Sequence, residues 1–157
     1  MRLEYFQLLD RIVELDLVNR SIRTEATVPL TSTIFEGHFP GYPLMPGVLL
    51  LETMAQTSGW LVIALTRFER MPFLAAFKEA KLRTFVTPGQ QLSISAKLEH
   101  EGSGYAVTRA AITINGKATC DSEITFRVVS FPVPELRAYM KTEAARLGFP
   151  MGAVADG

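Results

Sequence analysis

The sequence predicts an α+β fold in which a strongly curved antiparallel sheet wraps around one long central helix. Several segments alternate apolar and polar residues with a period of two, as half-buried strands do. Short turns containing glycine or asparagine separate these segments. A single long apolar run beginning near Pro46-Gly47 has apolar residues on all sides, so we expect its neighbours to bury it almost completely.

The first two predicted strands form a hairpin around the polar turn at residues 19–21. In the first strand, Val13, Leu15 and Leu17 alternate with acidic residues. Because alternate residues share one face of a strand, we expect these three side chains to lie on the same face. The second strand places four residues on one face in the same way: Ile22, Thr24, Ala26 and Val28.

The central helix is predicted from about Pro46-Gly47 to Phe68. Proline suits the first turn of a helix, because its missing N–H would be unpaired there. The run from Val48 to Leu65 has the length of a membrane span, but its polar residues would be costly in hydrocarbon. We therefore expect a buried helix. The interruptions are Glu52, Thr53, Gln56, Thr57, Ser58 and Gly59.

Four extended segments are predicted after the helix, at residues 73–85, 91–100, 105–114 and 118–129. The second alternates most clearly and follows the turn Pro88-Gly89. Asn115-Gly116, the strongest two-residue hairpin signal, joins the last two segments. The AAFKEAKL portion of the first segment is also compatible with a helix.

The chain after the last strand forms a C-terminal extension. Prolines at 132 and 134 end the strand pattern, and Leu136, Met140 and Leu147 are spaced as in a short amphipathic helix that Gly148 ends. We expect the remaining tail to be flexible and poorly ordered. The chain is thus divided into a domain of residues 1–130 and an extension of residues 131–157.

Composition excludes several classes of function. The 157 residues are 48% hydrophobic, and 16 basic residues balance 16 acidic ones, so net charge points neither to nucleic acid nor to an anionic membrane. The lone Cys120 cannot form an internal disulfide, and no Cys/His cluster has zinc-ligand spacing. The N-terminus lacks the features of a signal peptide. We expect a cytoplasmic protein without a metal or cofactor.

Glu52 is the first candidate for chemistry. A carboxylate in a helix buried on all sides costs several kcal/mol unless it is paired, hydrogen-bonded or protonated. Gln56 lies one turn further along, on the same face. A polar pair that only ties the helix to a loop would explain both residues equally well.

His38 lies in a loop bracketed by glycine and proline, which fixes the backbone and leaves the imidazole free to face a cavity. A structural or surface histidine is the simpler explanation. The helix that begins near Gly47, however, presents unpaired N–H groups that could bind a developing oxyanion. A base, an acid in an apolar setting and an oxyanion donor together suit elimination of water from a 3-hydroxyacyl compound.

The stretch FEGHFPGYPLMPGVLLLETMAQ, residues 35–56, closely resembles the signature of the 3-hydroxyacyl-acyl carrier protein dehydratases, a hot-dog family of dissociated bacterial fatty acid synthesis. The similarity includes a Gly-His-Phe-Pro loop, a Met-Pro-Gly-Val-Leu helix start and an acid fourteen positions after the histidine. It extends over about residues 6–128, through Leu9-Asp10-Arg11-Ile12-Val13, Lys81-Leu82-Arg83, Val86-Thr87-Pro88-Gly89 and residues 120–124.

The resemblance implies roles for four residues. His38 would remove the α-proton, and Glu52 would assist departure of the β-hydroxyl, giving a trans-2-enoyl product. The N–H of Gly47 would polarise the thioester carbonyl, and Gln56 would orient the acid. In this family the histidine and the acid that face one another come from different subunits, so the resemblance implies a homodimer, often assembled into a trimer of dimers. Glutamate rather than aspartate points to a dehydratase without isomerase activity.

The resemblance also implies a substrate site and a partner. Phe39, Pro40 and Val48 would line an acyl tunnel. The acidic acyl carrier protein would need basic residues near the tunnel mouth, although a solvated charged face explains the candidates as well: Lys78, Lys81 and Arg83. The long tail after Val129 suggests a specialised paralogue for long-chain or lipid A related acyl groups.

Two other functions remain open at this point. A hot-dog thioesterase would use an acid and a positioned water to release free thiol, but the interval between His38 and Glu52 argues against it. A non-catalytic acyl-binding subunit would keep the tunnel without the chemistry, and such a binder gains nothing from a buried acid. We expect His100 and Cys120 to be structural or surface residues.

Overall fold

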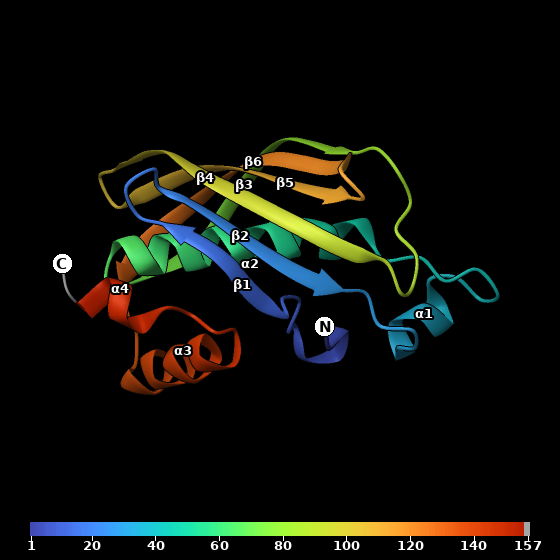
Figure 1. Ribbon diagram of the computed structural model, residues 1–157, viewed down its shortest axis with the longest axis horizontal. Helices are drawn as coiled ribbons and strands as arrows, with labels where there is room; N and C mark the ends of the chain where they lie inside the picture. The colour runs from blue at the N-terminus through green and yellow to red at the C-terminus, as the bar shows by residue number, and fades with distance from the viewer. Residues whose placement is uncertain (156–157) are drawn as a thin grey trace.

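The computed structural model describes residues 1–155 and has the predicted architecture. One antiparallel sheet of six strands curves around the long helix α2 (Figure 1). The sheet order is β1-β2-β4-β5-β6-β3, so β1 and β3 form its two edges. The elements are η1 (Leu3–Tyr5), β1 (Arg11–Asp16), β2 (Ser21–Thr27), α1 (Thr33–Gly37), α2 (Gly47–Leu65), β3 (Arg70–Leu82), β4 (Gln91–Gly102), β5 (Tyr105–Ile114), β6 (Lys117–Ser130), α3 (Pro134–Arg146) and α4 (Met151–Ala155).

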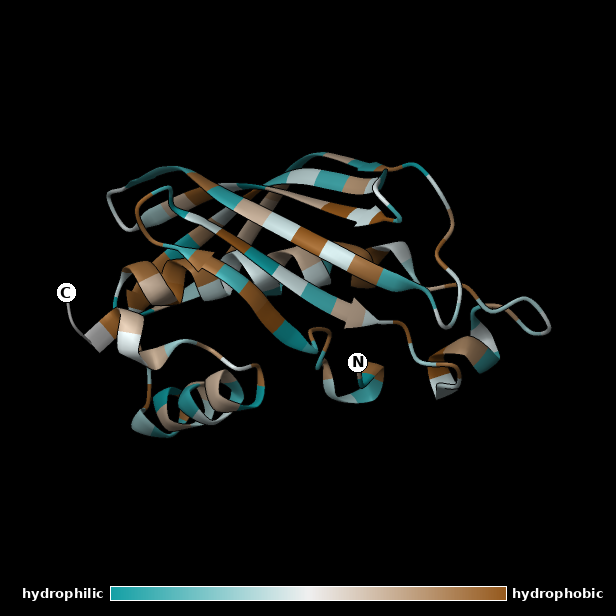
Figure 2. Ribbon diagram, in the orientation of Figure 1, coloured by the Kyte–Doolittle hydropathy of each residue, from teal (hydrophilic) through white to brown (hydrophobic). Residues whose placement is uncertain are grey.

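The strands after the helix confirm the alternation in the sequence. Figure 2 shows apolar and polar residues alternating along them, and in β4 the apolar set faces the core. Asn115 and Gly116 both have positive φ, as the predicted hairpin turn requires. The AAFKEAKL portion belongs to β3, because it pairs with β6 along the sheet edge. The strand spans residues 70–82, three residues earlier at each end than predicted.

The prediction that Val13 lies on the same face of β1 as Leu15 and Leu17 is wrong. The register of β1 against β2 shifts between Ile12 and Glu14, which leaves Val13 at a bulge and exposed. Ile12 therefore packs against the core together with Leu15 and Leu17. The sequence could not reveal this shift, because a bulge leaves the local alternation unchanged.

Helix α2 lies inside the curve of the sheet (Figure 1). It has the length and hydropathy of a membrane span, but 72% of that stretch is buried inside the protein, as in a core helix. Its buried hydroxyls have partners: Thr57 Oγ1 lies 2.8 Å from Thr24 Oγ1, and Thr108 donates to Ser58 Oγ at 2.8 Å. Among the described residues, no buried side-chain polar atom lacks a hydrogen-bond partner. The polar residues of the helix thus dock it onto particular strands.

The C-terminal extension joins the same hydrophobic core, and the prediction of a poorly ordered tail is wrong for its first part. Phe149 is buried, with its ring 5.9 Å from that of Trp60 and 5.1 Å from that of Phe68. Ala144 and Leu147 of the extension are buried as well. We expected disorder because the tail is short and contains small residues, but one aromatic ring anchors it. Residues 156–157 lie outside the described part of the chain.

Replacing Phe149 with alanine should lower the free energy of unfolding by about 3–5 kcal/mol, because it empties a buried aromatic site. Denaturant unfolding at a fixed protein concentration measures this change. Met151→Ala is the control, since Met151 is 44% exposed and should shift stability by no more than about 0.5 kcal/mol. Equal losses of unfolding free energy in Phe149→Ala and Met151→Ala would contradict the packing of Phe149 in the core.

Candidate active site

His38 is held in place from both directions along the chain. It follows α1, whose first turn Ser32 caps by accepting from the N–H of Ile34, and its own N–H donates to Ile34. The ring nitrogen Nδ1 lies 3.0 Å from the carbonyl oxygen of Leu44. A carbonyl can only accept, so Nδ1 carries the hydrogen, and in the neutral ring Nε2 is the nitrogen with the lone pair. The ring also stacks on Phe39, with 4.2 Å between centroids. The imidazole is therefore oriented with a basic nitrogen free.

Glu4 fastens α1 to the N-terminal segment. Its carboxylate accepts from the Ser32 hydroxyl at 2.6 Å and from the N–H of Thr33 at 3.0 Å. These hydrogen bonds, that of Ser32 first, lower the pKa of Glu4 to about 2. The loop that carries His38 is thus attached to the start of the chain.

The cavity beside His38 has a volume of about 390 Å³ and also contains the start of α2. Gly47, the first helical residue, lines it together with Phe39, Leu82 and Phe85. A Cβ at Gly47 would lie 2.5 Å from the Leu82 side chain, so glycine permits this close approach. The free N–H groups of the first turn of α2 and the imidazole therefore share one cavity.

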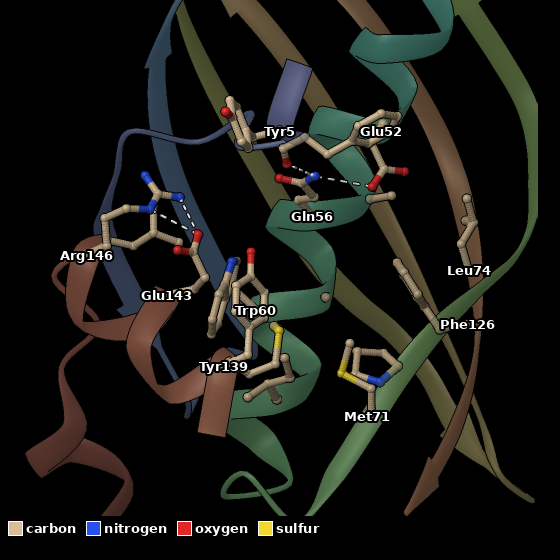
Figure 3. A pocket seen from close by; sticks show the side chains of 17 residues that line it. Tyr5, Glu52, Gln56, Trp60, Met71, Leu74, Phe126, Tyr139, Glu143 and Arg146 are labelled. Carbon is tan, nitrogen blue, oxygen red and sulfur yellow. Dashed lines mark hydrogen bonds and ion pairs between the residues drawn. The ribbon is translucent and has the colours of Figure 1, made fainter. Parts of the chain in front are cut away.

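Glu52 lies on α2 in a second cavity, of about 250 Å³ (Figure 3). Burial raises the pKa of its carboxyl group above the ordinary 4.5, while the hydrogen bond from Gln56 lowers it in part. Apolar residues of α2, β3 and β6 line the same cavity. A raised pKa favours the protonated carboxyl group, which is the form that acts as a general acid.

Gln56 connects Glu52 to the N-terminal segment. Its Nε2 donates to Glu52 Oε1 at 3.2 Å and to the carbonyl of Phe6 at 2.8 Å, and its Oε1 accepts from the N–H of Leu8 at 3.4 Å. A polar pair that ties the helix to a loop is therefore present, and it holds the carboxyl group in the cavity at the same time. The two explanations of these residues are compatible.

His38 and Glu52 do not meet within one chain. Among the described residues, the two cavities share no lining residue. The structure thus brings His38 together with Gly47, and Glu52 together with Gln56.

Only some of the residues predicted for the acyl tunnel and the carrier-protein patch lie at a cavity. Phe39 lines the His38 cavity, whereas Pro40 and Val48 are exposed and line neither cavity. Lys78 and Lys81 are exposed on the edge strand β3. Arg83 lies at the His38 cavity and forms an ion pair with Asp121, which offsets its charge.

Sequence reasoning missed most of the wall around Glu52. Trp60, Met71, Phe126 and Tyr139 line that cavity. The only local signal was the i, i+4 spacing from Gln56 to Trp60, because the other residues come from distant segments. Cys120 is buried, which raises the pKa of its thiol to about 11, so it remains protonated and a poor nucleophile at neutral pH.

Comparison with known proteins identifies the family of the chain. Residues 2–125 match the model of the FabA-like domain. The 3-hydroxyacyl-[acyl-carrier-protein] dehydratase FabZ of Clostridium acetobutylicum is 34% identical over 123 residues, which cover 78% of this chain and 86% of the relative. The FabZ of Latilactobacillus sakei is 37% identical over 120 residues, with 76% and 85% covered.

Solved structures show the same fold at lower identity. A hypothetical thioesterase protein from Streptococcus pneumoniae, solved with coenzyme A, has a TM-score of 0.59 and 18% identity, over 76% of this chain and 85% of that chain. The PaaI protein of the E. coli phenylacetic acid degradation operon has a TM-score of 0.60 and 14% identity, with 76% and 78% covered. These similarities confirm the hot-dog fold and carry no argument about the reaction.

The raised pKa of Glu52 makes stability depend on pH. Between 4.5 and its higher folded pKa, the folded protein binds a proton that the unfolded chain has released, so the contribution of this group falls as pH rises. Glu52→Gln abolishes the titration. Relative to the wild type, the free energy of unfolding of the variant should therefore increase from acidic to neutral pH.

Denaturant unfolding of both proteins across this pH range measures the difference. Glu135→Gln is the control for replacing a glutamate by glutamine, because Glu135 is exposed. A difference between Glu52→Gln and the wild type that stays constant or falls as pH rises would contradict burial of the carboxyl group.

Proposed function

The chain belongs to the FabA-like family, and from this premise we propose that it is a hydro-lyase that dehydrates 3-hydroxyacyl groups carried by acyl carrier protein in fatty acid biosynthesis. The observation that carries the proposal is the state of the two chemical groups. His38 has a free basic nitrogen beside the start of a helix, and Glu52 has a raised pKa in an apolar cavity. The two groups thus offer the nitrogen and the carboxyl group that the two proposed roles need.

The elimination uses the two groups in turn. Nε2 of His38 removes the α-proton, and the negative charge that develops on the thioester oxygen is stabilised by the N–H of Gly47. The C–O bond to the β-hydroxyl then breaks, and Glu52 supplies the proton with which it leaves as water. The electron pair of the former C–H bond forms the trans-2 double bond. Gln56 keeps the acid in position through its bonds to Phe6 and Leu8.

We propose that a second copy of the chain completes the site. Because His38 and Glu52 line separate cavities of one chain, both can act on one thioester only if they come from different chains. The edge strand β3 offers a surface for this pairing. Within residues 1–155 its outer edge carries no partner strand, and Phe73 and Leu74 are 40% and 44% exposed there. The proposed homodimer has two sites and can assemble further into a trimer of dimers.

The remaining roles follow from this assembly. Phe39, Pro40 and Val48 would line the tunnel entrance once a second copy covers them. Lys78, Lys81 and Arg83 would receive the acidic carrier protein at the rim. The reaction needs no metal or cofactor, and we place the enzyme in the cytoplasm.

His38→Ala and Glu52→Gln should each lower turnover of a 3-hydroxyacyl carrier substrate by about 10²–10⁴-fold, because each removes one proton-transfer group. The conjugated enoyl thioester absorbs in the near ultraviolet, so its formation measures turnover directly. Both variants should retain their fold by circular dichroism.

Lys97→Ala, on the exposed face of β4, is the control and should keep wild-type turnover. Wild-type turnover by both site variants would show that the mechanism is wrong. Release of free thiol from a saturated acyl thioester, without enoyl formation, would identify a thioesterase instead.

A further inference from the structure

We propose that the C-terminal extension builds the far end of the acyl site, where Trp60, Tyr139 and Met140 set the longest acyl chain that the enzyme accepts. The inference rests on the proposed function, because it places the acyl chain in the Glu52 cavity. It assigns a role to residues beyond position 125, where the match to the family model ends.

The cavity follows one face of α2, starting at the proposed acid. Its lining residues on α2 are three or four positions apart, as one helix face requires: Glu52, Ala55, Gln56, Gly59, Trp60 and Ile63. At ~1.5 Å per residue, this stripe is about 16 Å long. Ala55 and Gly59 leave the middle open, and the large side chain of Trp60 follows. The cavity is thus a groove with small residues in its middle and the large Trp60 farther from Glu52.

The size of the groove suits one unbranched apolar chain. Its volume of about 250 Å³ is below the roughly 300–1,000 Å³ of pockets for drug-sized ligands. Met71, Leu74 and Phe126 supply apolar side chains on the wall formed by β3 and β6. An acyl chain whose thioester lies at Glu52 would therefore extend along α2 toward Trp60.

Helix α3 forms the opposite wall and is fixed at both ends. Near its start, Arg137 donates to the carbonyl of Phe68 at 2.9 Å and to Glu69 at 2.8 Å, just past the end of α2. Near its end, Arg146 donates to the carbonyl of Leu9 at 3.1 Å, beside the segment that binds Gln56. Helix α3 therefore runs antiparallel to α2 along the whole groove.

The two charged residues of α3 that line the groove, Glu143 and Arg146, are compatible with an apolar acyl chain. Arg146 Nη2 lies 2.8 Å from Glu143 Oε2, and Glu143 Oε1 accepts from Gln7 at 3.3 Å. The two charges offset one another at the side of the groove. Figure 3 shows this ion pair, and the bonds from Gln7 to Glu143 and from Arg146 to the carbonyl of Leu9 connect α3 to the N-terminal segment.

The far end of the groove is a rigid stop. Figure 3 shows Trp60 and Tyr139 further along α2 than Glu52 and Gln56, and Met140 lines the same cavity. Trp60 packs on Phe149 of the extension, and Phe149 packs on Phe68. These ring contacts hold Trp60 in place, so the groove can lengthen only where a lining side chain such as Met140 is shortened.

Two substitutions test the inference in opposite directions. Met140→Ala lengthens the groove at its end, and Gly59→Leu obstructs its middle. A Cβ at Gly59 would lie 3.7 Å from Pro72, an ordinary contact, so the added leucine carbons enter the groove. Met151→Ala is the matched control, because Met151 lies on α4 and does not line the cavity. Thermal unfolding confirms that each variant is folded.

The readout is the kcat/KM ratio of long to short 3-hydroxyacyl carrier substrates, measured over a graded series. We expect Met140→Ala to raise this ratio about tenfold and Gly59→Leu to lower it by about tenfold or more, since each methylene in an apolar pocket is worth ~10-fold or more. Met151→Ala should leave the ratio unchanged. Equal ratios in the wild type and both groove variants would overturn the inference while leaving the dehydratase intact.

Binding provides a second readout that does not need turnover. Titration of each variant with saturated acyl-pantetheine thioesters of graded length should show the same shifts in chain-length preference. Such shifts without dehydration of any substrate would support the groove and contradict the proposed function. Binding that ignores the substitutions would contradict the groove.

Discussion

The side chain of Gln56 joins the carboxyl group of Glu52 to the carbonyl of Phe6, with hydrogen bonds of 3.2 and 2.8 Å. A carboxyl group in a core helix is tolerated only where it is hydrogen-bonded or protonated. Here both conditions contribute, because the bond from Gln56 limits the rise in pKa that burial causes. The N-terminal segment must therefore cross α2 near Gln56, in the middle of the helix, and its position follows from the chemistry of one helix face.

The rest of the molecule is arranged around that face. The other sides of α2 are buried against the sheet and docked by buried hydroxyl pairs. Small residues on the open face leave a groove, and α3 covers its side. On the opposite side of the active site, α1 and its Glu4 contacts position His38. In the proposed mechanism, each chain thus carries two half-sites, an acid with a groove and a base with an oxyanion donor.

Local patterns in the sequence predicted much of this. The strands of the β4–β6 meander, the Asn115-Gly116 turn and the central helix each depend on neighbouring residues, so periodicity found them. The bulge at Val13 was missed because register depends on the partner strand. The burial of Phe149 and the groove wall at Tyr139 were missed because they arise from contacts across the chain. His38, Gly47, Glu52 and Gln56 could be chosen as candidates because they lie within one short segment, but their division into two cavities needed the fold.

The central claim is that one chain supplies only half of each active site. Mixing His38→Ala and Glu52→Gln subunits after reversible dissociation tests it most directly. In the heterodimer, the intact histidine of one chain faces the intact acid of the other, so one of two sites is restored. With half of the dimers mixed, enoyl formation should return to about a quarter of the wild-type rate. If subunit exchange is demonstrated and the mixture is still as inactive as each variant alone, the claim is contradicted.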